Sequence, residues 1–216
     1  MDFALLRERL HIVAERIPEI GGTVRELVMD PPATEAEIAE AERELGRRLP
    51  VSFRKALAEF SSNFIRHWIF PEAFRLTGDL VGIFGGSAHW GLHPVIECES
   101  QRKDWVKNVF SNPLDEYDKV WHNKLAFLDL GNGDFLAFDL NGGDDPPVVY
   151  LSHDDGEGHG YVLGRNFAEF LDHWSRLAFV GLEDWQWLPF VKDRSVGLDP
   201  ECGLAREMRE ILKLNL

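Results

Sequence analysis

The chain has 216 residues, of which 44% are hydrophobic and 28% are charged, and its formal net charge is −14. This composition is typical of a globular protein and excludes a disordered chain. The excess of acids argues against nucleic-acid binding, which requires neutralised phosphates, and against anionic membrane surfaces. Cys98 and Cys202 form no Cys-x-x-Cys pair, so we expect free thiols. The N-terminus lacks the apolar run of a signal peptide or membrane span, so we expect a cytoplasmic protein.

Helical patterns open the chain. From Asp2 to Ile17 the apolar residues recur at helical spacing, and Pro18 ends the pattern. Thr34 is a good N-cap and Glu37 stands three residues later, which predicts a capping box at the start of a second helix. Leu49-Pro50 then opens a third helix, with the proline in its first turn.

Short apolar runs at residues 68–70 and 80–84 predict the first strands, and we interpret Gly85-Gly86-Ser87 as a plain loop. A helix is predicted from His93 to Phe110. Asn166 and Glu169 predict a second capping box, before an amphipathic helix. Asp199-Pro200 supplies the N-cap and first position of a last helix.

The segment 124–151 contains the clearest strand pattern. Asn132-Gly133 lies between two apolar runs and predicts a type I′ turn, because both central residues of that turn need positive φ. A two-residue turn would place Leu130 opposite Phe135. A third strand follows Pro146-Pro147, which cannot donate ladder hydrogen bonds. We therefore expect a single α+β domain with a central mixed or antiparallel sheet, a 124–151 hairpin-plus-strand core and flanking helices.

These elements divide the chain into three parts. Residues 1–30 form an N-terminal helical extension, and residues 31–182 form the α+β domain. Residues 183–216 form an aromatic segment and a helix that pack on the same domain. In that last part Trp185 and Trp187 are spaced as on one face of a strand or as a cover over the edge of a core.

The acids are concentrated in one stretch. Eight acids and no lysine or arginine lie between Leu125 and Gly164. We expect the loops on both sides of the third strand to carry a negative field and to form a docking patch for a basic protein. The candidate contacts are Asp144, Asp145, Asp154, Asp155 and Glu157. The alternative is a solvated surface that has no partner.

A cluster of possible metal ligands lies in the same stretch. It consists of His153, Asp154, Asp155, Glu157 and His159, whose side chains suit zinc, manganese or iron. The spacing is not His-Glu-x-x-His, and the residues lie in a glycine-containing loop rather than on one helix face. The sequence also lacks the Gly-x-Ser-x-Gly nucleophile motif. We predict no catalytic residue, no metal and no cofactor; a metal-dependent hydrolase using His153, Asp154, Asp155 and His159 is the alternative.

The segment Thr34–Leu57 resembles the opening motif of the SUKH superfamily, which is a capped helix, Leu-Gly, Leu-Pro, then an aromatic residue and a second helix. Residues 129–153 resemble the strand core of that family, and Asn166–Leu171 resembles its closing helix. The similarity covers Pro32 to Leu177. It departs from the family pattern at Ser61-Ser62-Asn63, where relatives usually have an Asn-Gly turn.

The resemblance implies an α+β fold with a central mixed sheet, and binding rather than catalysis. The superfamily includes fungal cell-wall-assembly regulators and many bacterial immunity proteins, which neutralise polymorphic toxins that are often nucleases. We therefore expect a bacterial immunity protein whose acidic surface covers the basic site of a toxin and imitates the charge of nucleic acid. The alternative is a scaffold or regulatory protein without a toxin partner.

Overall fold

The computed structural model describes residues 1–216, except for the side chains of Glu26 and Leu27. The strands are β1 (Thr23–Met29), β2 (Asn63–Ile69), β3 (Gly85–Gly91), β4 (Lys124–Asp129), β5 (Phe135–Asp139), β6 (Val148–Leu151) and β7 (Val162–Gly164). The helices are α1 (Phe3–Glu19), α2 (Glu35–Leu45), α3 (Val51–Glu59), α4 (Leu92–Asn108), α5 (Asp118–Trp121), α6 (Phe167–Arg176), α7 (Asp184–Trp187) and α8 (Gly203–Leu212).

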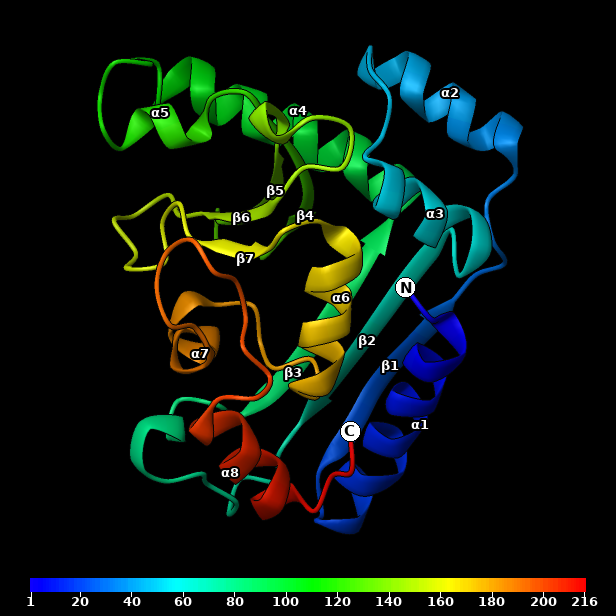
Figure 1. The fold of residues 1–216 in the computed structure, drawn as a ribbon, viewed down its shortest axis with the longest axis vertical. Coiled ribbons are helices and arrows are strands. Elements are labelled where there is room, and N and C mark those ends of the chain that lie inside the picture. The colour runs from blue at the N-terminus through cyan, green and yellow to red at the C-terminus, as the bar shows by residue number, and fades with distance from the viewer.

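The strands form two antiparallel sheets, which confirms the α+β class and divides the expected central sheet in two. Sheet A has the order β1-β2-β3 and sheet B the order β4-β5-β6-β7. Their neighbouring edges meet where the His89 ring of β3 lies 3.0 Å from the backbone oxygen of Asp129 on β4. Helices α1 and α6 lie on one side of sheet A, and α4 lies above sheet B in the view of Figure 1.

Sheet A is packed closely around Trp68 of β2. The indole of Trp68 donates a 2.8 Å hydrogen bond to the backbone oxygen of Ala178. Gly86 pairs with Trp68 across the sheet, and a Cβ at that position would lie 2.1 Å from Trp68 Nε1. Gly85-Gly86 therefore starts strand β3, and the predicted loop there is wrong. The predicted strand at 80–84 is also wrong: the 3₁₀ turn Gly78–Leu80 is followed by a turn at residues 81–82, and residues 83–84 lead into β3 without being part of a strand.

The β4–β5 hairpin has a longer loop than the sequence predicts. Asp129, rather than Leu130, pairs with Phe135, and a bulge lies between Ala126 and Leu128. The backbone N–H of Leu130 donates to the Asp134 oxygen at 3.0 Å, which closes a five-residue loop over 130–134. The side chain of Asn132 accepts from the Asp134 N–H at 2.8 Å, so this asparagine turns the chain through its side chain rather than through positive φ.

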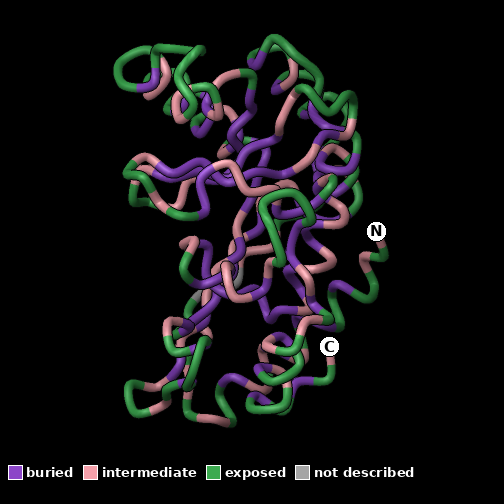
Figure 2. The backbone as a smooth tube through the Cα atoms, turned by 60° about the vertical axis from the view of Figure 1, so that its left-hand side comes forward, coloured by how far each residue is buried: buried purple, intermediate pink, exposed green. Residues whose placement is uncertain are grey.

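The larger hydrophobic core joins both sheets to α1, α2, α3 and α6, and a smaller core lies between sheet B, α4 and α5. A buried ion pair fixes the smaller core. Arg102 Nε donates to Glu99 Oε2 at 2.8 Å, and the same oxygen accepts from the Ala126 N–H of β4 at 3.1 Å. Figure 2 shows that the exposed residues gather at loop tips and outer helix faces.

Both ends of the chain contact the central body. Residues 23–29, expected within a helical extension, form strand β1 and pair with β2. Arg9 of α1 forms a 2.7 Å ion pair with Asp172 of α6, and Arg16 Nε donates to the Leu212 oxygen of α8 at 2.6 Å. The division at residues 30 and 182 stays a prediction. Among the described residues, no helix has the length and apolarity needed to cross a membrane.

The predicted helix ends are confirmed in part. Thr34 and Glu37 form the full capping box at the start of α2. Asn166 accepts from the Glu169 N–H at 2.9 Å, but the Glu169 carboxylate accepts from the Arg165 N–H at 2.6 Å, so the second box is half formed. Helix α8 begins at Gly203, four residues after the predicted cap at residue 199. The cysteines are free, as expected.

Candidate functional site

The predicted contact residues lie at opposite ends of strand β6. Asp144 and Asp145 precede the strand, whereas Asp154, Asp155 and Glu157 follow it. Because β5 and β6 are antiparallel, the second group shares its end of sheet B with the β4–β5 loop, and the first group lies beside α3. The five acids therefore form two groups, one at each end of β6, and their contact with a partner stays a prediction.

Asp145 caps the start of α3 through its side chain. The N-cap residue of this helix, Pro50, offers no side-chain hydrogen bond. Asp145 Oδ1 accepts instead from the N–H of Ser52 at 2.8 Å and from its hydroxyl at 2.6 Å. The preceding Asp144 accepts from the Val51 N–H through its backbone oxygen at 3.0 Å, and its side chain is exposed. A remote carboxylate therefore caps α3, and the charge of Asp145 is used within the fold.

The loop after β6 is held in place by the contacts of a buried histidine, and it carries exposed acids. The ring of His159 is buried: its Nδ1 accepts from the Ser152 N–H at 3.0 Å, and its Nε2 donates to the Tyr117 oxygen at 3.1 Å. The same ring stacks on that of Tyr117 with centroids 3.8 Å apart. Burial lowers the pKa of His159, so the ring is neutral in this loop. Asp154, Asp155 and Glu157 remain exposed around it.

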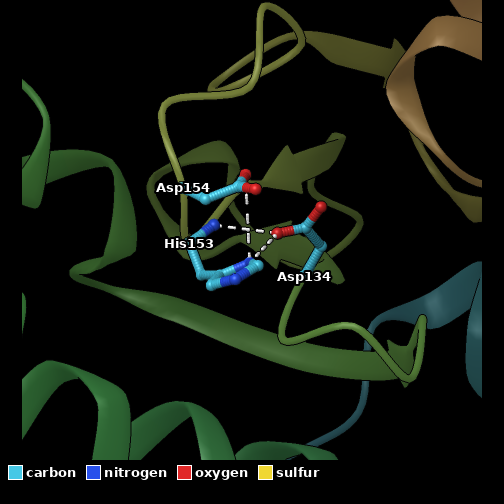
Figure 3. A group of neighbouring side chains, drawn as sticks. All are labelled: Asp134, His153 and Asp154. Carbon is cyan, nitrogen blue, oxygen red and sulfur yellow. Dashed lines mark hydrogen bonds and ion pairs between the residues drawn. The ribbon is translucent and has the colours of Figure 1, made fainter.

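A buried carboxylate joins this loop to the β4–β5 loop. Asp134 is 3% exposed and accepts from the N–H of His153 at 2.8 Å and from its Nδ1 at 2.7 Å (Figure 3). Its other oxygen accepts from the Tyr150 hydroxyl at 2.5 Å and from Asn132 Nδ2 at 3.1 Å. Burial raises the pKa of Asp134, but the hydrogen bonds from Tyr150 and His153 outweigh it and leave the pKa below its ordinary value.

A third segment, from the C-terminal part of the chain, adds two acids. Glu183 accepts from Asn132 Nδ2 at 2.8 Å, and Asp184 accepts from the Gly158 N–H at 2.9 Å. Burial raises the pKa of Glu183, and the nearby negative charges of Asp134 and Asp184 raise it further. We call Asp154, Asp155, Glu157, Glu183 and Asp184 the acidic loop end. The sequence gives no signal for the last two, because only tertiary packing brings residue 183 to the loop.

Exposed aromatic rings lie beside the acidic loop end. Trp185 follows Asp184 and is 45% exposed, and its ring lies 5.8 Å from that of Phe84, which is 53% exposed. The indole lies over Gly82, where a Cβ would come within 2.9 Å of it. Trp187 is buried, because residues 184–187 form the short helix α7 rather than a strand. Phe84 and Trp185, here the aromatic pair, thus form an apolar surface next to negative charge.

The same residues fit a metal poorly. Ligand atoms of Asp134, His153 and Asp154 lie within 4.8 Å of one another. Both oxygens of Asp134 already accept two hydrogen bonds each, and His153 Nδ1 carries the proton of one of them. Both ring nitrogens of His159 are engaged with backbone groups, so the ring does not join the set. A metal would have to displace the bonds that hold the two loops together.

Comparison with protein families places the chain in one of them. Residues 32–173 match the SMI1/KNR4 family, also called SUKH-1. The match ends within α6, so the aromatic pair has one member inside it, Phe84, and one outside it, Trp185. Comparison with curated proteins gives no match. The match covers more than half of the sequence, and the chain therefore belongs to the SMI1/KNR4 (SUKH-1) family.

Proposed function

We propose that this protein is a bacterial immunity protein that binds and neutralises a basic toxin domain without catalysis. Membership of the family supports an immunity-like or regulatory protein-binding module. The observation that carries the finer proposal is the junction of the acidic loop end with the exposed aromatic pair. Exposed aromatic rings beside exposed carboxylates can supply the apolar core and the polar rim of a protein interface.

The two parts of this surface have different tasks. Trp185 and Phe84 supply the apolar area that a partner pocket can desolvate, as interface hot spots do. The carboxylates of the acidic loop end attract a basic partner over distance and raise the association rate. Because Tyr117 and His159 fix the loop before binding, little conformational entropy is lost when the partner docks.

A nuclease domain is the partner that this charge suits best. Its active site must bind phosphates and is therefore positively charged. Carboxylates at the acidic loop end would occupy that site in place of the nucleic-acid backbone. Asp144 and Asp145 are left out of the proposed contact, because they lie at the other end of sheet B and Asp145 caps α3.

The proposal is tested by growth rescue. Open reading frames beside the gene are expressed singly, and each one that arrests growth is expressed again with this protein. We expect one basic toxin domain to be neutralised, and the Asp154→Lys/Asp155→Lys/Glu157→Lys variant to lose protection. The control is Glu207→Lys/Glu210→Lys, which reverses two acids on the exposed side of α8 and should protect like the wild type.

Two results would contradict the proposal. If no neighbouring product arrests growth, the regulatory alternative replaces the immunity function. If the loop variant is folded and protects fully, the toxin binds elsewhere on the molecule.

A further inference from the structure

We propose that a second surface, the groove between α2 and α4, binds a basic amphipathic helix of a partner protein. The groove encloses about 700 Å³ between these helices and the β1–α2 and α3–β2 connections. It lies on the opposite side of sheet B from α7 (Figure 1), so it is separate from the acidic loop end. The inference does not depend on the proposed function.

The floor of the groove is apolar, and the apolar side chains that α2 contributes to it are small. Helix α2 contributes Ala36 and Ala41, and α4 contributes Leu92, Pro94 and Ile96. Ala41 is buried and shares a face of α2 with Glu37 and Glu44, which stand four residues before it and three residues after it, whereas Ala36 is exposed. Small side chains allow the backbone of another helix to come close. The lined part of α2, from residue 36 to 44, spans about 12 Å, or two helical turns.

The rim of the groove is negative. It carries the carboxylates of Asp30, Glu37, Glu40, Glu44 and Glu97. Among the described residues no lysine or arginine lines it. Glu37 is used in the cap of α2, and Glu40 is paired with Arg43.

Two of the rim carboxylates are uncompensated. Glu44 stands on the α2 side and Glu97 on the α4 side, and both are exposed. Neither forms an ion pair with a described side chain. The groove therefore presents unpaired negative charge on both of its walls.

These features define the occupant. An apolar floor between two charged walls matches a helix that has one apolar face and lysines or arginines on its flanks. The walls are themselves helices, so the occupant would pack as a third helix and bring its cations to Glu44 and Glu97. An acidic or uncharged helix would leave those carboxylates without partners while burying the same floor.

The test uses a synthetic amphipathic helical peptide of leucine and lysine as the probe, titrated into isotopically labelled full-length protein. We expect amide shifts in α2 and α4. Ala36→Trp fills the groove without changing the charge, and Glu44→Lys/Glu97→Lys reverses both walls. Each variant should weaken binding by about tenfold or more, the equivalent of about 1.4 kcal/mol. Unchanged melting temperatures establish that the variants fold.

Controls separate the groove from general charge attraction. Glu207→Lys/Glu210→Lys should bind the peptide like the wild type, and an analogue with glutamate in place of lysine should not bind. Shifts that map elsewhere, equal affinity in the Ala36→Trp variant, or no binding would overturn the inference. Because the growth assay does not involve this peptide, either proposal can fail alone.

Discussion

The two ends of sheet B carry the same kind of side chain and use it differently. Beside α3, the carboxylate of Asp145 accepts two hydrogen bonds from Ser52 and serves the fold. At the other end, the buried Asp134 has that structural role, whereas Asp154 and Asp155 are exposed, and Asp154 accepts one hydrogen bond from the Ser152 hydroxyl at 3.0 Å. An excess of acids along a sequence therefore does not measure the field at a surface, because each carboxylate must first be followed to its partners.

The largest stability effect is expected at Asp134. The Asp134→Ala variant leaves the Tyr150 hydroxyl and two N–H groups of His153 without their acceptor. We expect a loss of about 3 kcal/mol in the free energy of unfolding, measured by urea denaturation. Asp134→Asn keeps part of the acceptor set and should lose less. A change below about 0.5 kcal/mol in the alanine variant would show that Asp134 does not hold the two loops.

A smaller loss is expected at the other end of the sheet. Asp145→Ala removes the remote cap of α3 and should cost about 1 kcal/mol, also by urea denaturation. The matched control is Asp144→Ala, whose side chain is exposed, and it should stay within about 0.5 kcal/mol of the wild type. Equal losses of unfolding free energy in the two variants would show that Asp145 has no special role in capping α3.

Acidification should weaken the loop after β6. The pKa of His159 in the folded state lies below its ordinary value of 6.5, because burial opposes the charged ring. Below pH 6.5 the unfolded chain binds this proton first, so stability should fall as the pH is lowered towards the folded-state pKa. His159→Gln should reduce the slope of unfolding free energy against pH in that range. Burial also lowers the pKa of His89, so part of the pH dependence should remain in the His159→Gln variant. An unchanged slope, or a slope of zero, would contradict the assignment of this pH dependence to His159.

The smallest stability effect is expected where the proposed contacts lie. Asp154, Asp155 and Glu157 are exposed, so the triple reversal to lysine should change the unfolding free energy by no more than about 0.5 kcal/mol per site, with most of the loss at Asp154, which accepts from the Ser152 hydroxyl at 3.0 Å, and at Asp155, whose φ is 64°. Calorimetry of this variant checks the expectation. A larger loss would mean that these side chains hold the loop, which would weaken their assignment to a partner.

Local signals in the sequence predict local structure correctly. The Thr34–Glu37 capping box and the helical stripe of residues 2–17 both depend on near neighbours, and both are present. The hairpin register fails because Asp134 is drawn into contacts with Tyr150 and His153, which the turn residues alone do not reveal. The loop prediction at Gly85-Gly86 fails for a similar reason: Gly86 makes room for Trp68 on the neighbouring strand β2.

The candidate site is predicted only in part for the same reason. Asp154, Asp155 and Glu157 are visible as an acidic run, and the structure keeps them exposed together. Glu183 and Trp185 reach the same surface from a distant segment, and the groove between α2 and α4 combines residues about 50 positions apart. Such groupings arise from packing, and no pattern of spacing within one segment contains them.

The association rate with the neutralised toxin domain, measured by stopped flow over a range of salt concentrations, tests the central claim most directly. Reversal of Asp154, Asp155 and Glu157 to lysine should slow association by about tenfold or more at low salt and flatten its salt dependence, while Asp144→Lys leaves both close to wild type. Equal rates and equal salt slopes for the wild type and the triple variant would contradict the account.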